Sequence, residues 1–208
     1  MKKYVNLFVF IFMVGTCFSQ NKAQTKSAVS YKNPVVDIAM PDPTVIKAAD
    51  GYFYVYATES TRNVPIMKSK DLVQWTFCNT AFTNKTRPRF EPKAGIWAPD
   101  INYINNKYVL YYAMSVWGGE QTCGIGVATA DSPQGPFTDH GKMFRSNEIG
   151  VQNSIDPSFL QYEGRNYLVW GSFRGIYVIE LTEDGLSLKP GAEKKRIAGT
   201  AFEAAYIH

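Results

Sequence analysis

The sequence contains DPTVIKAADGYFYVYAT at residues 42–58, in which an acid and a proline open an apolar run, a polar turn follows, and a second run is rich in aromatic residues. The pattern returns in PDINYINNKYVLYYAMS at 99–115 and in DPSFLQYEGRNYLVWGS at 156–172. The central turns carry Asn, Asp or Gly, which suit a tight turn between antiparallel strands. Each of the three segments therefore predicts a β-hairpin.

Each hairpin is followed by two further strand-like runs around a polar bend, at residues 65–77, 126–137 and 177–188. No long helical period accompanies them. The units repeat every 47 to 58 residues. Four strands per unit at such a period indicate a β-propeller, in which four-stranded blades surround a central axis. A β-sandwich does not require so regular a period.

Acids recur where the units begin. The first strand of each propeller blade lies nearest the axis, so side chains at its start converge from distant parts of the chain. We align Asp42, Asp100 and Asp156 as such starts, and Glu203 lies in the segment that would begin the next unit. This alignment predicts a group of carboxylates at one mouth of the funnel.

The chain reaches His208 just inside the fourth unit. Three blades and the start of a fourth cannot close a ring, because propellers have at least four blades. We therefore expect a truncated propeller that is inactive or nearly so, since an unclosed ring would not hold the acids in place. The alternative is a complete open stack of three sheets, which would leave two sheet edges exposed.

The first residues have the composition of an export signal. Two lysines precede an apolar stretch too short to span a bilayer, and small residues follow it. We expect a signal peptide over residues 1–20, a flexible leader over 21–32 and a partial catalytic propeller domain over 33–208. The protein would be periplasmic or extracellular, and an outer-membrane lipoprotein acylated at Cys17 is the minor alternative.

Composition argues against two classes of partner. The net charge of +4 comes with no basic run or stripe, so nucleic acid is not expected. No second hydrophobic segment predicts a transmembrane helix. Cys78 and Cys123 follow the expected signal peptide, and we expect that they do not form a disulfide, although sequence alone does not decide whether they meet.

The acids also suggest a chemistry. Carboxylates that share one cleft push their pKa values apart, so that one can act as a base while another holds a proton. A base, an acid and a third carboxylate that tunes the acid are the groups needed to break a glycosidic bond. The sequence contains neither an HExxH nor a GxSxG motif. Any single acid before a proline could equally cap a turn.

The motifs together resemble those of glycoside hydrolase family 43. They run in family order over about residues 33–208 and read MPDPTV, SKDLVQW, IWAPDI, IGVATADSPQGPF, NSIDPSF, YLVWGSFRGI and EAAYIH. The resemblance implies an all-β fold, a five-bladed β-propeller of which about three blades and the start of a fourth are present. It also implies hydrolysis with inversion of the anomeric configuration.

The resemblance assigns roles to individual residues. Asp42 would be the general base that activates water, Glu203 the general acid, and Asp156 the carboxylate that tunes and orients the acid. Asn153 and Ser172 would hydrogen-bond the sugar at the cleavage point. Trp97 and Trp117 are candidate platforms for sugar stacking, with core positions between blades as the alternative. Asp100 matches no catalytic position of the family, so we interpret it as structural.

The implied substrate is plant cell-wall polysaccharide. NSIDP with WGSFRGI is most similar to the endo-arabinanase-like branch, which cleaves α-L-arabinofuranosyl linkages in arabinan; arabinoxylan, cleaved by a β-xylosidase or arabinofuranosidase of the same family, is the alternative. The sequence leaves endo against exo action open. No cofactor is required, no metal ligand is assigned within this chain, and a structural calcium is an expectation for a longer protein only.

Two further classes are weighed against this interpretation. The invertase-like five-bladed family is retaining and is expected to carry an arginine before the middle Asp-Pro and a cysteine after the acid, whereas this chain has Ile155 and Ala204 there. A non-catalytic carbohydrate-binding propeller would need aromatic platforms but no intact set of three acids, and all three acids are present.

Overall fold

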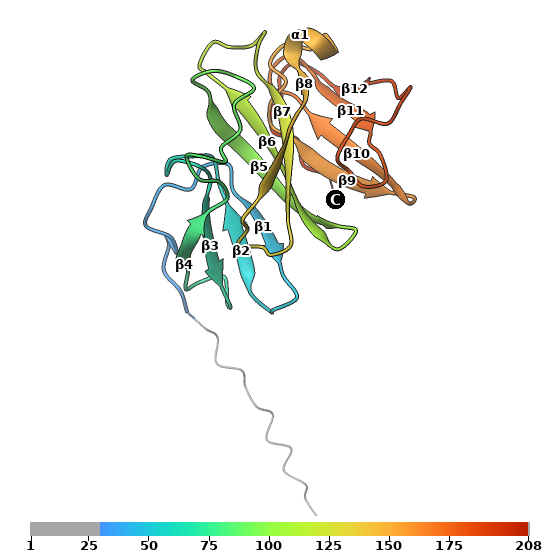
Figure 1. Ribbon diagram of the computed structural model, residues 1–208. Helices are drawn as coiled ribbons and strands as arrows, with labels where there is room; N and C mark the ends of the chain where they lie inside the picture. The colour runs from blue at the N-terminus through green and yellow to red at the C-terminus, as the bar shows by residue number, and fades with distance from the viewer. Residues whose placement is uncertain (1–29, 208) are drawn as a thin grey trace, which may run out of the picture. The chain divides into compact units, whose positions relative to one another are not determined.

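The computed structural model describes residues 30–207, so the predicted signal peptide and most of the predicted leader lie outside the described residues. Within that range the strands form three four-stranded antiparallel sheets, each a simple meander. Figure 1 shows them as three separate blades in chain order. The expected all-β architecture with three propeller blades is therefore confirmed for the described part of the chain.

Blade 1 contains β1 (Thr44–Lys47), β2 (Phe53–Tyr56), β3 (Pro65–Ser69) and β4 (Thr76–Thr80). Blade 2 contains β5 (Gly95–Ile104), β6 (Lys107–Ser115), β7 (Gly124–Ala130) and β8 (Thr138–Arg145), followed by the short α1 (Ser146–Ile149). Blade 3 contains β9 (Ser158–Tyr162), β10 (Arg165–Trp170), β11 (Ile176–Glu180) and β12 (Lys195–Ala198).

The predicted hairpins are present with the turn chemistry that the sequence suggested. Ile104 pairs with Lys107 across Asn105 and Asn106, whose φ angles are 48° and 62°. Two positive φ angles match the twist of the flanking strands, and asparagine tolerates them better than most residues. In blade 3 the turn uses Glu163 and Gly164 in the same way.

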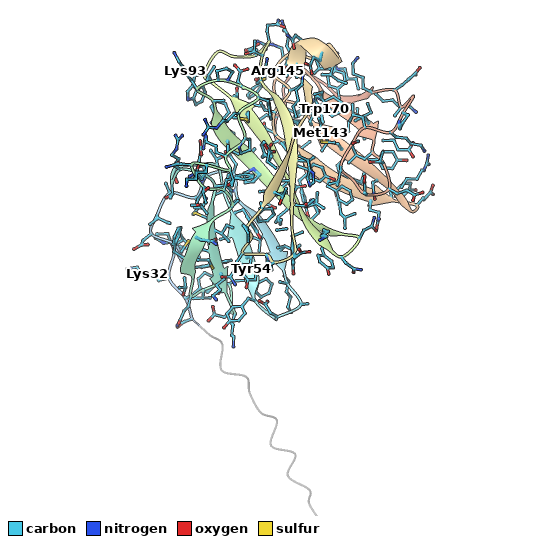
Figure 2. All side chains as sticks on the ribbon, in the orientation of Figure 1. Lys32, Tyr54, Lys93, Met143, Arg145 and Trp170 are labelled. Atoms are coloured by element: carbon cyan, nitrogen blue, oxygen red, sulfur yellow. The ribbon has the colours of Figure 1, made fainter. Side chains whose placement is uncertain are left out.

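Apolar residues from neighbouring blades form two buried clusters. The first joins blades 1 and 2 around Tyr56, Phe82 and Tyr112. The second joins blades 2 and 3, where the fully buried Trp170, labelled in Figure 2, packs against Phe144 with ring centroids 5.0 Å apart. Burial of these faces fixes how each blade meets the next, because apolar area removed from water is the main favourable term in folding.

The innermost strands lie together, since β5 contacts both β1 and β9. Here one alignment from the sequence was wrong. The counterpart of Asp42 and Asp156 in blade 2 is Ala98: each of these residues precedes a proline and has a positive φ, of 48°, 56° and 39° respectively. Asp100 lies two residues later, because the irregular pairing between Trp97 and Asp100 lengthens β5 at its start.

Asp100 instead occupies a buried position between blades. Its Oδ2 accepts hydrogen bonds from the backbone N–H of Phe159 at 2.7 Å and from Asn102 Nδ2 at 2.8 Å. The hydroxyl of Thr44 points to its Oδ1 at 3.5 Å. Burial raises the pKa of the Asp100 carboxyl, while these hydrogen bonds oppose the rise. Asp100 thus connects β1, β5 and β9.

The two cysteines of the described chain are free. Cys78 lies in β4 of blade 1, whereas Cys123 is fully buried at the start of the blade 2 strand β7, next to Ser146. Burial raises the pKa of both thiols. The expectation that these cysteines do not pair with each other agrees with their separate positions.

Candidate active site

A cavity of about 720 Å³ lies where the three innermost strands and the last residues of the chain meet. Asp42 and Asp156 line it, as does Ala204, the residue after Glu203. Asp100 and Asn102 lie further along the same wall. Two of the three acids that the sequence predicted for the catalytic site, Asp42 and Asp156, therefore share one cavity although 114 positions separate them, and the third, Glu203, directly precedes a lining residue.

Asp156 is the electrostatic centre of the group. The pKa of its carboxyl is raised from 3.8 to about 7, first because burial disfavours the charged form and then because the Glu203 and Asp42 carboxylates repel a further negative charge. A hydrogen bond from the Ala204 backbone opposes the rise. Both other acids therefore lie close enough to Asp156 to influence its ionisation.

Asp42 and Asp156 have the same unusual backbone conformation. Their left-handed φ angles are rare for residues other than glycine, and such conformations persist where the surrounding structure enforces them. In both cases a proline follows and the innermost strand begins two residues later. The repeated Asp-Pro motif thus produces one local geometry twice, with the acid at the strand entrance.

Glu203 is exposed and is held by Ser172 of blade 3. The Ser172 hydroxyl donates to Glu203 Oε2 at 3.1 Å, and the two residues form an isolated antiparallel bridge. Asn153 Nδ2 donates in turn to the Ser172 carbonyl oxygen at 3.0 Å. Two residues predicted to contact the sugar therefore form a chain of hydrogen bonds that ends at the predicted acid.

Trp97 and Trp117 lie next to each other, with ring centroids 5.5 Å apart. Trp97 is half-buried and packs against the small cluster formed by Ala113, Cys123 and Ile155, whereas 94% of the Trp117 surface is exposed. Trp97 thus joins an apolar cluster while Trp117 presents a free aromatic face. An exposed indole of this kind has the amphipathic character that sugar-binding surfaces use.

The structure adds neighbours that the sequence did not indicate. The Thr58 hydroxyl donates to Asp42 Oδ2 at 2.6 Å and accepts from the Ala98 N–H at 2.6 Å. Arg174 donates to both carboxylate oxygens of Glu120, linking the loop before β7 to the loop after β10. Thr58 ends the GYFYVYAT motif, but nothing in a single sequence distinguishes it from other strand-terminal threonines.

No group of three or more His, Cys, Asp or Glu side chains that could hold a metal ion occurs within residues 30–207. A metal site built from three such side chains therefore does not occur among these residues. In the same range, no helix is long and apolar enough to cross a membrane.

Comparisons with known proteins place this chain among relatives. The family described as "Glycosyl hydrolases family 43" matches residues 31–208. The chain is 36% identical over 177 residues to the extracellular endo-α-(1→5)-L-arabinanase 1 of Bacillus subtilis, covering 78% of this chain and 54% of that protein. It thus spans about half the length of that curated relative.

Solved structures show the same fold. The family 43 endo-arabinanase from Bacillus licheniformis superimposes with a TM-score of 0.70 at 29% sequence identity, covering 82% of this chain and 61% of that one. The Cellvibrio cellulosa α-L-arabinanase, solved in complex with arabinohexaose, superimposes with a TM-score of 0.68 at 26% identity, covering 81% and 58%.

Proposed function

Because the chain belongs to glycosyl hydrolase family 43, we propose that its three carboxylates are the catalytic groups of an inverting hydrolase that cleaves α-1,5-linked L-arabinofuranosyl units in arabinan. The observation that carries the proposal is the raised pKa of Asp156, which arises where Asp42 and Glu203 approach it at the cavity. The relatives named as arabinanases support the choice of substrate.

The division of labour follows from the surroundings of each acid. Burial and the neighbouring Glu203 and Asp42 carboxylates raise the pKa of Asp156 to about 7, so Asp156 can hold a proton near neutral pH. Glu203 is the exposed member of the pair and is held by Ser172, so we assign to it the transfer of a proton to the leaving-group oxygen. Asp156 is more buried, so we assign to it the role of tuning and orienting the Glu203 carboxyl.

Asp42 would act from the opposite side of the sugar. It is exposed at the cavity mouth, where its carboxylate can take a proton from water as that water attacks the anomeric carbon. The bond between the anomeric carbon and the leaving-group oxygen then breaks, and Glu203 protonates that oxygen. An inverting mechanism needs room for the water, with roughly 6.5–9.5 Å between base and acid carboxyl groups. Asn153, Ser172, Trp97 and Trp117 would bind the sugar.

The first test is paired substitution of the acids. Asp42→Asn and Glu203→Gln should each lower kcat on debranched arabinan by about 10²–10⁴-fold, the usual contribution of a general acid or base. Asp71→Asn is the matched control, because Asp71 caps its own turn in blade 1 and Asn can keep that role. A rate within a few-fold of the parent protein for either acid variant would refute the assignment.

The second test concerns stereochemistry. Proton NMR of the first product should show the β-anomer before mutarotation, since a single displacement inverts the α-linkage. Initial release of the α-anomer would mean a covalent intermediate and a different role for Asp42. Faster hydrolysis of arabinoxylan than of arabinan would instead support the alternative substrate, which a β-xylosidase or arabinofuranosidase of the same family would cleave.

We also propose that the protein is exported. Two relatives are named extracellular, and the lysines and apolar stretch at the start of the sequence support a signal peptide. Mass spectrometry of the mature protein from cells should find a new N-terminus near residues 19 and 20. Acylation at Cys17 would instead support the lipoprotein alternative.

A further inference from the structure

Thr58 follows strand β2 of blade 1 and contacts Asp42, which precedes strand β1 of the same blade. Its backbone N–H donates to the Pro41 carbonyl oxygen at 2.9 Å, and its hydroxyl donates to Asp42 Oδ2 at 2.6 Å. Two hydrogen bonds therefore hold Thr58 against residues 41 and 42. The second one is made to the carboxylate that the proposed function uses as the base.

The direction of this hydrogen bond is set by Ala98. The Ala98 N–H donates to Thr58 Oγ1 at 2.6 Å. A threonine hydroxyl has one hydrogen and two lone pairs, so once a lone pair accepts from Ala98, its hydrogen is free to point at Asp42. The result is a chain of two hydrogen bonds with one direction: the Ala98 N–H donates to the Thr58 hydroxyl, and this hydroxyl donates to the Asp42 carboxylate. Ala98 is also the blade 2 counterpart of Asp42.

The segment around Thr58 is anchored between blades 1 and 2. The next residue, Glu59, donates its backbone N–H to the Ile96 carbonyl oxygen at 3.1 Å, and its side-chain Oε1 accepts from the Ile96 N–H at 3.1 Å. Its side chain forms an ion pair with Arg87, and the two side chains are only 8% and 6% exposed. A buried pair whose carboxylate and guanidinium make several further hydrogen bonds is a rigid support.

Asp42 itself has little packing to restrain it, because its side chain is exposed at the cavity mouth. An exposed aspartate ordinarily samples several rotamers. A base must stay within hydrogen-bond reach of the water that it activates, and a displacement of about 1 Å can cost about 10²-fold in rate. Restraint of Asp42 therefore has to come from its polar neighbours.

We propose that Thr58 is a positioning residue for Asp42: its hydroxyl, oriented by the Ala98 N–H, holds Oδ2 and leaves Oδ1 to receive the proton from water. The inference rests on the proposed function, since it takes Asp42 as the base. Thr58 touches neither substrate nor water in this role. It acts through the carboxylate alone.

The kinetic test compares Thr58→Val with Thr58→Ser. Valine keeps the shape and removes the hydroxyl, so kcat on arabinan should fall about 10–100-fold while KM changes by less than about twofold. Serine keeps the hydroxyl and should retain kcat within about threefold of the parent. Thr129→Val is the matched control, because the Thr129 hydroxyl bonds His140 in blade 2. An unchanged kcat in Thr58→Val, or a loss that serine does not rescue, overturns the inference.

A double-mutant cycle separates this inference from the proposed function. If Thr58 acts only through Asp42, adding Thr58→Val to Asp42→Asn should change the residual rate by less than about twofold. Independent, multiplicative losses would show that Thr58 has a merely structural role. Full activity of Asp42→Asn alone would instead refute the proposed function.

A third measurement, by NMR, needs no turnover, so it tests the inference even if the protein shows no hydrolysis. In NMR spectra, the Asp42 side-chain couplings should report one χ1 rotamer in the parent protein and in Thr58→Ser, and rotamer averaging in Thr58→Val. Thr58→Ala serves as the second variant if valine prevents folding, which circular dichroism checks. A single Asp42 rotamer in the variant without the hydroxyl overturns the inference.

Discussion

Asp156 shows how much of the site depends on one residue's surroundings. A free aspartate is ionised at neutral pH, but burial and two neighbouring carboxylates raise the Asp156 pKa to about 7. The sequence predicted that the acids would meet, yet it did not indicate which of them would be the most buried. That difference arises from the burial of Asp156, which only the folded chain creates.

The raised pKa predicts a stability difference that depends on pH. Between pH about 4 and 7 the folded protein binds more protons at Asp156 than the unfolded chain, so its stability should fall as pH rises through that window. Asp156→Asn removes this penalty. We expect the variant to be more stable than the parent by about 1–3 kcal/mol at pH 8, since solvent screens part of the full shift.

The measurement is urea unfolding of both proteins at pH 4 and pH 8. The advantage of Asp156→Asn should be small at pH 4, where the parent carboxyl is protonated in the folded protein and still about half protonated in the unfolded chain, and larger at pH 8. An advantage that is equal at both pH values would mean that it arises from packing or hydrogen bonding rather than from ionisation.

At the scale of the strands, the hairpins were predictable because their turn chemistry is local. The Asn105-Asn106 turn and its pairing of Ile104 with Lys107 follow from residues within a few positions of each other. The start of β5 was not predictable in the same way. The irregular pairing after Trp97 depends on contacts with β6, and it moved Asp100 out of the alignment with Asp42.

Strand β7 offers a test of packing within a blade. A Cβ added at Gly126 would overlap the Tyr112 ring, which lies between Phe82 and Phe90 and whose hydroxyl donates to Asp139. Gly126→Ala should therefore destabilise the protein by about 1–3 kcal/mol, the usual cost of overpacking a core.

Thermal and urea unfolding would check this expectation against Gly199→Ala, since an added Cβ at Gly199 meets no atom within 4 Å. The control should change stability by less than about 0.5 kcal/mol, as surface substitutions usually do. Equal stability of both variants would show that the Tyr112 ring can move aside.

At the scale of the whole described chain, Asp100 is the residue that connects the blades at their inner strands. It receives the Phe159 N–H from blade 3 and faces Thr44 of blade 1 while belonging to blade 2. The sequence interpretation of Asp100 as structural agrees with this placement. The sequence alignment that placed Asp100 at the start of its blade does not agree with this placement.

Asp100→Leu should cost about 1–3 kcal/mol of unfolding free energy, because the partly buried Phe159 N–H loses its acceptor. Asp100→Asn keeps a carbonyl oxygen for that bond and removes a buried carboxyl, so its stability should stay within about 1 kcal/mol of the parent. Urea unfolding followed by tryptophan fluorescence would measure both. A leucine variant as stable as the parent would show that Asp100 does not tie the blades together.

The sequence by itself determined the strand-rich repeat, the hairpin turns and the family, because alternating apolar patterns, turn residues and ordered motifs are all properties of short stretches. It also predicted the three acids as the candidate catalytic groups, since their Asp-Pro and Glu-Ala-Ala-Tyr motifs are local. Only the tertiary structure decided which groups touch them. The Thr58 hydroxyl donates to Asp42, the Ser172 hydroxyl donates to Glu203, and the Ala98 N–H of blade 2 donates to Thr58; these partners lie 16 to 40 positions apart, and contacts at such separations carry no local sequence pattern.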